Sequence, residues 1–179
     1  SSNLRIHNGI APVGKLLEKG IKVAMGSDEA TINDDKDMFA EMRLALRLHY
    51  LPGIDNVNPT PYQIFQMATE FGAYASWFGD KVGTLEPGKR ADIVLLNLQN
   101  IEYPFIDPEV TVVESLVYRG RSQDVDTVMI DGDVVMQDGR LTHVDKEAVL
   151  RELNQALDRP LEPEELEARE VAREVEPHM

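Results

Sequence analysis

The sequence predicts an α/β fold. A short apolar run at residues 21–26 lies between two segments with helical periodicity, 11–20 and 34–50, and this alternation is typical of strands in a parallel sheet. Later in the chain the pattern becomes extended, and Asp-Gly at 131–132 separates two apolar runs, which is the strongest short signal of a β-hairpin. From residue 145 the helical period returns.

Three segments in the first half of the chain have the spacing of amphipathic helices. The first, 11–20, ends at Gly20, a residue favoured just after the last helical turn. The second, 34–50, begins with aspartates, where the helix dipole favours acids. The third, 61–78, opens on Pro61, a good first helical residue. The residues that share a face in these helices are Val13, Leu16 and Leu17, then Met38, Met42, Ala45, Leu46 and His49, then Ile64, Ala68, Phe71 and Ala75.

The predicted strand at 21–26 needs partners that the sequence does not offer. A parallel strand requires neighbours for its backbone N–H and C=O groups, and the sequence shows no second strand–helix unit. The chain also begins at Ser1 without an initiator methionine. We therefore expect the rest of a barrel or sheet to lie upstream of this sequence.

The middle of the chain is predicted to be mainly extended. Residues 91–96 form an apolar run of the kind found in buried strands. Residues 110–118 fit both a short helix and a strand, and Asp-Pro at 107–108 favours the helix. The runs 125–130 and 134–136 flank the Asp-Gly turn, and we expect them to pair.

The last part of the chain is predicted to be an acidic helical extension. From Asp145 onward, Val149, Leu150, Leu153 and Leu157 lie on one helical face. Residues 147–176 contain ten acidic residues and four arginines, a net charge of −6. The simplest interpretation of this charge run is a solvated helix face.

Composition excludes several classes of function. The net charge of −14 disfavours nucleic acid and anionic lipid as partners, because both are themselves negative. The absence of cysteine excludes disulfides and thiolate metal sites and agrees with a reducing compartment, so we expect a cytoplasmic protein. No apolar run approaches the roughly 20 residues of a membrane span, and no signal-peptide pattern opens the chain.

Six blocks of the sequence occur together in an informative order. They are Ser2-Asn3-Leu4-Arg5, Gly9-Ile10-Ala11-Pro12-Val13, Gly26-Ser27-Asp28, and the stretches 37–43, 82–94 and 125–132. In this order they resemble the carboxyl-terminal part of the amidohydrolase superfamily, and most closely its branch of chlorohydrolases, triazine hydrolases and adenosine- or guanine-type deaminases. The resemblance covers about residues 1–155.

The resemblance implies a three-part architecture. Residues 1–81 would be the last strand and helices of a (β/α)₈ TIM barrel, and residues 82–142 part of a composite β-sandwich. Residues 143–179 would be the acidic helical extension, which matches no block of the family.

The resemblance also assigns roles to individual residues. Asp28 aligns with the family's aspartate at the end of the eighth barrel strand, which binds the catalytic metal and transfers protons; an isolated aspartate there would more often be a turn or cap residue. Ser2 and Asn3 align with a polar pair after the seventh strand and are candidate substrate-binding residues. Glu29 stands where the family often has glycine, and a second carboxylate there would favour cationic or donor-rich substrates.

The remaining metal ligands of the family are absent from the sequence. The family's site also needs His-x-His near the first strand and further histidines after the fifth and sixth strands, whereas the histidines here are His7, His49, His143 and His178. A hydrolytic metal takes about three protein ligands. We therefore expect zinc or iron in the full-length protein, no metal on this chain alone, and no activity of this chain alone. We interpret His7 as a surface residue and His49 as a helix-packing residue.

The family resemblance predicts metal-assisted hydrolysis of a C–N bond other than a peptide bond, and in particular deamination of an aminated heterocycle, with a small molecule as substrate. The alternative is a non-catalytic acidic α/β interaction or assembly domain that kept the scaffold, and a third possibility is that a separate chain supplies the missing half. The unpaired strand predicts a homo-oligomer, because exposed strand edges recruit other chains.

Overall fold

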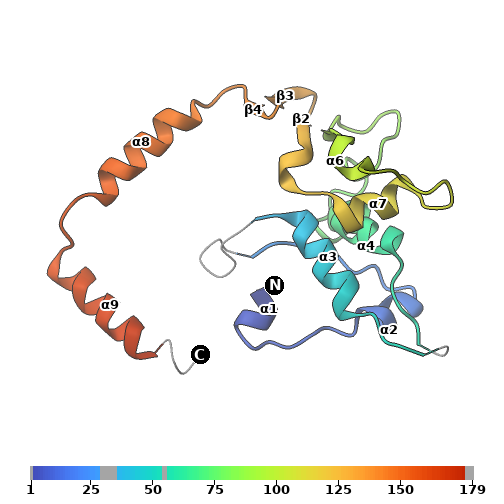
Figure 1. The fold of residues 1–179 in the computed structure, drawn as a ribbon, viewed down its shortest axis with the longest axis horizontal. Helices are drawn as coiled ribbons and strands as arrows, with labels where there is room; N and C mark the ends of the chain where they lie inside the picture. Colours follow the sequence, from blue (N-terminus) through green and yellow to red (C-terminus); the bar gives the residue numbers. More distant parts are fainter. Residues whose placement is uncertain (1, 29–35, 54–55, 176–179) are drawn as a thin grey trace. The chain divides into compact units, whose positions relative to one another are not determined.

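The computed structural model describes residues 2–28, 36–53 and 56–175, which carry colour in Figure 1. The chain divides into two units, residues 1–142 and residues 143–179. Helices α1–α7 and the sheet belong to the first unit, and α8 and α9 belong to the second. Among the described residues, none of the helices combines the length and the apolar character that a membrane crossing requires.

The helices of the first unit begin at residues suited to capping. Asp37 accepts hydrogen bonds from the Phe39 and Ala40 N–H groups at 2.8 and 3.3 Å, and Thr60 and Gln63 form a reciprocal capping box. The helices are α1 (Ser2–Arg5), α2 (Val13–Glu18), α3 (Met38–Leu48), α4 (Pro61–Ala68), α5 (Glu70–Ala75), α6 (Gln99–Glu102) and α7 (Val112–Arg119).

The predicted helices are confirmed with shorter bounds. Segment 11–20 contains α2, segment 34–50 contains α3, and the ambiguous segment 110–118 is helical, as α7. The predicted helix 61–78 is interrupted at Thr69, whose backbone (φ −125°, ψ −94°) leaves the helical region and separates α4 from α5. The short helices α1 and α6 were not predicted.

One apolar core joins α2, α3, α4 and α7. Figure 1 shows α3, α4 and α7 close together, and their buried side chains form a continuous cluster with α2. The cluster consists of Val13, Met42, Leu46, Ile64, Met67 and Val117. Burial of such side chains is the main stabilising contribution in a fold of this kind.

Residues 21–28 adopt no regular secondary structure in the described chain, so the strand predicted at 21–26, whose partners were expected outside this sequence, stays a prediction. In the described part of the chain no strand pairs with this segment. Its Met25 N–H donates instead to the Met67 carbonyl of α4, at 2.9 Å. The apolar pattern correctly indicated packing, since Val23 and Met25 lie against the core. A strand, however, is defined by neighbours on its edges, and local pattern cannot supply them.

The sheet has four antiparallel strands in the order β1-β2-β3-β4. They are β1 (Ile93–Leu96), β2 (Val125–Ile130), β3 (Asp133–Gln137) and β4 (Arg140–Leu141). The predicted strand at 91–96 and the predicted hairpin are confirmed as β1 and as β2–β3. At the hairpin turn Asp131 and Gly132 have positive φ values of 53° and 90°, the conformation for which Asp-Gly is favoured. The short strand β4 was not predicted.

The end of α7 is tied to the start of α3 by polar contacts. Arg43 of α3 donates to the Gly120 carbonyl, and the Ser122 N–H donates to the Asp37 carboxylate at 3.4 Å. Beside them the buried carboxylate of Asp124 accepts hydrogen bonds from the Asn100 amide and the Arg121 N–H, both at 2.9 Å. The passage from α7 into β2 is therefore anchored on the helical part of the unit.

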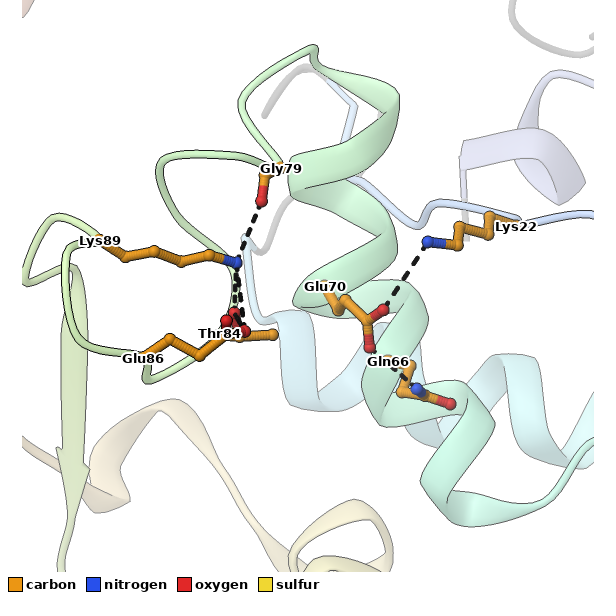
Figure 2. Close-up of polar contacts among 7 residues, drawn as sticks. All are labelled: Lys22, Gln66, Glu70, Gly79, Thr84, Glu86 and Lys89. Atoms are coloured by element: carbon orange, nitrogen blue, oxygen red, sulfur yellow. Dashed lines mark hydrogen bonds and ion pairs between the residues drawn. The ribbon is translucent and has the colours of Figure 1, made fainter.

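The turn at residues 79–89 is organised around one ammonium group. Figure 2 shows Lys89 contacting the Gly79 carbonyl at 3.1 Å, the Thr84 hydroxyl, and the Glu86 carboxylate at 3.4 Å. The hydrogen bond from Thr84 and the charge of Lys89 lower the pKa of the Glu86 carboxyl. This segment leads from α5 into β1.

The second unit consists of α8 (Lys146–Leu157) and α9 (Pro163–Val175). Asp145 caps α8 by accepting from the Ala148 N–H at 3.0 Å. Between the helices Arg159 donates to Glu165 at 2.7 Å, and this contact lowers the pKa of Glu165 from 4.5 to about 2. The predicted helical extension is thus two helices joined by a short turn.

Candidate active site

The segment that carries Asp28 is held against α4 and α5 by its earlier residues. Figure 2 shows the Lys22 ammonium 3.8 Å from the Glu70 carboxylate, which also accepts from the Gln66 amide at 3.0 Å. The same ammonium lies 4.5 Å from the centre of the Tyr74 ring, within the range of a cation–π contact. Together with the hydrogen bond from the Met25 N–H to the Met67 carbonyl, these contacts fix the position of the chain directly before residues 26–28.

A cavity of about 400 Å³ lies beside this segment. Its lining comes from three stretches that are far apart in the sequence: residues within 2–13, residues within 23–28, and one face of α3, with Met67 of α4 adding to them. Leu44, Ala45 and Leu48 make the α3 wall largely apolar. A concave, mainly apolar space with a few convergent polar groups is the usual form of a small-molecule site.

Three of the four predicted site residues line this cavity together. Ser2 and Asn3 lie in α1, and Asp28 lies at the end of the segment anchored through Lys22. Ser2 is buried, whereas Asn3 and Asp28 are exposed to solvent. The fourth, Glu29, lies outside the described residues, so its predicted role stays a prediction.

Two polar residues of the cavity were not predicted as site residues. Glu41 of α3 is a buried acid that lines the cavity, and His49 lies at the other end of the same helix face. The ring nitrogens of His49 contact two backbone carbonyls, Nδ1 that of Ala45 at 2.7 Å and Nε2 that of Ala11 at 2.8 Å. The prediction that His49 packs a helix is confirmed, and it joins α3 to the segment before α2. His7 is exposed, as predicted.

The helical spacing of the sequence could have identified Glu41 as a residue of the candidate site. Residues 41, 45 and 49 follow at intervals of four and therefore share a face. Glu41 lies on that face, next to the core residue Met42. An acid in this position indicates that the surface of the helix changes there from the apolar core to a polar environment.

The polar character of the cavity is acidic. Among the described residues that line it there are two carboxylates, Asp28 and Glu41, and neither lysine nor arginine. Carboxylate oxygens are hydrogen-bond acceptors, so these two side chains can accept from N–H donors. The part of the chain that the structure describes brings no three His, Cys, Asp or Glu side chains together as a metal site. The described residues alone therefore do not fit a catalytic metal.

A second cavity, of about 860 Å³, lies between α3–α5 and strands β1 and β2. Its walls are apolar side chains such as Phe39, Phe65 and Val128, and none of the predicted site residues lines it. It reflects how the helices meet the sheet and adds no chemistry to the candidate site.

Comparison with known proteins decides the family. A sequence model of the Amidohydrolase family matches residues 1–135. The chain belongs to this family. A curated relative, the 5-methylthioadenosine/S-adenosylhomocysteine deaminase of Syntrophomonas wolfei, is 38% identical over 149 residues, which are 83% of this chain and 34% of the relative. The chain thus spans about a third of the length of the curated relatives it matches.

Solved structures of amidohydrolases share the fold of the chain. An adenosine deaminase from Xanthomonas campestris with bound zinc is 31% identical, with a TM-score of 0.76 over 88% of this chain and 35% of that one. The atrazine chlorohydrolase of Arthrobacter aurescens, complexed with zinc, is 25% identical, with a TM-score of 0.77 over 86% of this chain and 34% of that one. These deaminase and chlorohydrolase neighbours agree with the branch of the family that the sequence motifs resemble.

Proposed function

We propose that this chain is the carboxyl-terminal part of a metal-dependent hydrolase that deaminates an adenine nucleoside substituted at its 5′ position. The observation that carries the proposal is the convergence of Ser2, Asn3 and Asp28 on one cavity, since these are the residues that the family resemblance selects. The relatives named for deamination of methylthioadenosine and adenosylhomocysteine support the choice of substrate. An acidic cavity suits a neutral heterocycle that carries an exocyclic amine donor.

In the proposed architecture, residues 1–81 complete a (β/α)₈ barrel and residues 82–142 complete a β-sandwich. Residues 21–26 are then the eighth barrel strand, paired with strands from the rest of the full-length protein. Their position against α4, through Met25 and Met67, is compatible with that role. Asp28 follows directly at the carboxyl end of the segment, where such barrels have their active sites.

The metal of the reaction needs ligands from outside the described residues. We propose Asp28 as one of its ligands in the full-length protein, with zinc or iron as the metal; zinc is bound in the solved relatives. A bound divalent metal makes water a stronger nucleophile and polarises the reacting carbon.

The proposed role of Asp28 in the chemistry is proton transfer. Water adds to the ring carbon that bears the amine, and the Asp28 carboxylate accepts a proton from that water. The same proton then passes to the amine nitrogen as the C–N bond breaks and ammonia leaves, so the carboxylate is regenerated. Asp28 is suited to this exchange because its carboxylate lies at the cavity with access to solvent.

The experiment is Asp28→Asn in the full-length protein, with ammonia release measured from methylthioadenosine, adenosylhomocysteine and adenosine. We expect a loss of about 10²–10⁴-fold in kcat, the usual contribution of a general acid–base, with the fold intact. Asp80→Asn, at an exposed turn remote in sequence from the site, is the matched control and should retain full activity. A folded Asp28→Asn protein within a few fold of the unsubstituted rate would contradict the role. An unsubstituted protein that releases no ammonia with either metal would favour the alternative of a non-catalytic scaffold.

A further inference from the structure

The break between α4 and α5 provides a backbone acceptor for the segment that carries Asp28. Thr69 leaves the helical region of φ and ψ, so α4 ends before it and α5 begins at Glu70. In an unbroken helix the Met67 carbonyl would accept from the N–H group four residues later. At the break it lies at a helix end, where carbonyls need other donors, and the Met25 N–H donates to it at 2.9 Å.

The side chain of Lys22 meets the same break. Figure 2 shows its ammonium 3.8 Å from the Glu70 carboxylate, which also accepts from the Gln66 amide across the break at 3.0 Å. The ammonium lies 4.5 Å from the centre of the Tyr74 ring and 5.7 Å from that of Phe71, both within cation–π range. One lysine is thus held by a carboxylate and two aromatic rings, all of them on α5.

These contacts hold a short piece of chain at both of its ends. Lys22 is attached through its side chain and Met25 through its backbone, and Asp28 follows closely in the sequence. Gly26 and Ser27, which connect Met25 to Asp28, are exposed. Asp28 takes part in an interaction of its own, and the anchor at residues 22–25 adds to it. The direction in which the chain reaches the candidate site is therefore set at the α4–α5 break.

We propose that Lys22 and Glu70 are positioning residues: their ion pair, with the aromatic rings beside it, holds residues 22–25 against α5 and so places the Asp28 carboxylate for proton transfer. This inference rests on the proposed function in one respect, that Asp28 transfers the proton. Among the described residues that line the cavity, neither Lys22 nor Glu70 occurs, so the pair acts through the chain and not by contact with the substrate.

Loss of this pair should slow the chemical step and leave substrate binding unchanged. A misplaced proton-transfer group weakens the transition state and not the ground state, which lowers kcat at constant KM. The effect should be moderate, because the side chains of Lys22 and Glu70 are 43% and 36% exposed. An exposed ion pair and an exposed cation–π contact together correspond to a factor of about 3–30.

The first measurement does not depend on activity and uses the 179-residue chain. Hydrogen exchange at the Met25 amide reports how firmly this residue is bonded to α4. We expect exchange about 3- to 30-fold faster in Lys22→Met. Lys22→Arg should match the unsubstituted chain, because arginine keeps the charge and stacks on aromatic rings. Lys15→Met, which removes the same charge from an exposed lysine of α2, is the matched control and should leave the rate unchanged.

The partner in the ion pair is tested by Glu70→Gln. This variant should speed exchange at the Met25 amide as well, and it gives the same test if Lys22→Met does not fold. Because the two residues act as one pair, the double variant should exchange more slowly than the product of the two single effects predicts. An effect equal to that product would mean that the two side chains act independently, which contradicts the proposal.

The second measurement is the rate of ammonia release by the full-length protein. We expect Lys22→Met to lower kcat by about 3- to 30-fold at constant KM, and Lys22→Arg to restore it. The rate is expressed per folded molecule, with the folded fraction taken from circular dichroism, so that loss of folded protein does not count. If the unsubstituted protein releases no ammonia, the proposed function fails, and hydrogen exchange at Met25 still decides whether the anchor exists.

Three further results would overturn the proposal. The first is unchanged exchange at the Met25 amide in both Lys22→Met and Glu70→Gln. The second is exchange that becomes faster to the same extent throughout α4 and α5, which would indicate a general loss of stability. The third is an unchanged kcat, or a rise in KM alone, in Lys22→Met, since the pair would then not act through Asp28.

Discussion

Gly120 offers a sharp test of how α7 packs against α3. It ends α7 with ordinary backbone angles (φ −57°, ψ 148°), so alanine could adopt its conformation without strain. A Cβ at this position, however, would lie 2.6 Å from the carbonyl oxygen of Leu116 and 3.0 Å from Cδ1 of Phe39. The first of these atoms belongs to the helix backbone and cannot rotate away. The Gly120 carbonyl also accepts the Arg43 hydrogen bond, so any shift of the backbone disturbs the tie to α3.

The size of the effect follows from two opposing contributions. Overpacking of a well-packed site costs about 1–3 kcal/mol. Replacing glycine by alanine restricts the unfolded chain and offsets this by about 0.4–1 kcal/mol. We therefore expect Gly120→Ala to lower the free energy of unfolding by about 1–2 kcal/mol.

The control for this prediction is Gly26→Ala. A Cβ at Gly26 meets no atom within 4 Å, and its φ lies outside the left-handed region. We expect this variant to be as stable as the unsubstituted protein or slightly more stable. The assay is urea denaturation of both variants of the 179-residue chain, followed by circular dichroism. If Gly120→Ala unfolded at the same urea concentration as Gly26→Ala, the described contact between α7 and α3 would be wrong.

Three further predictions concern the 179-residue chain by itself. Because no three ligating side chains gather among the described residues, the purified chain should retain no metal after dialysis, and near-stoichiometric zinc or iron in elemental analysis would contradict this. The chain should self-associate, more so at moderate salt because its charge of −14 opposes association, and light scattering that shows a cooperative monomer at every salt concentration would refute this. Since the pKa of Glu165 falls from 4.5 to about 2, its contact with Arg159 should stabilise the start of α9 fully above pH 4.5 and be lost as the pH falls through 2. A carboxyl NMR titration checks this, and Arg159→Gln should raise the midpoint but leave it below the ordinary range, because the Glu162 N–H still donates to Glu165.

Secondary-structure elements that depend on the backbone preferences of a few neighbouring residues were predictable from the sequence. The Asp131-Gly132 pair predicts the hairpin because its preferred backbone angles already bring two strands together. Pro61 marks the start of α4 for the same kind of reason, since its fixed φ suits the first helical turn. The interruption at Thr69 has no comparable local signal, and a single helix over 61–78 was the natural prediction.

The residues of the candidate site likewise include some that were identified from the sequence and one that was not. The order of the family motifs was enough to select Ser2, Asn3 and Asp28 as candidate site residues. Residue types and their order can be read from the sequence without knowledge of the tertiary packing. Glu41 was not selected, since an acid in the first turn of a helix is ordinarily explained by the helix dipole. Its burial, and its place on the cavity with Asp28, depend on how α3 lies against two distant segments.

By itself, then, the sequence determined where helices begin, where the hairpin turns and which family the motifs resemble. Those properties depend on backbone preferences and side-chain spacing over a few residues. Only the tertiary structure decided that residues 21–26 form no regular secondary structure in the described chain and bond to α4 through Met25, and that α1, α3 and the Asp28 segment share one cavity. Both outcomes depend on which distant backbone groups and side chains come into contact, and that information is not present in any local stretch of the chain.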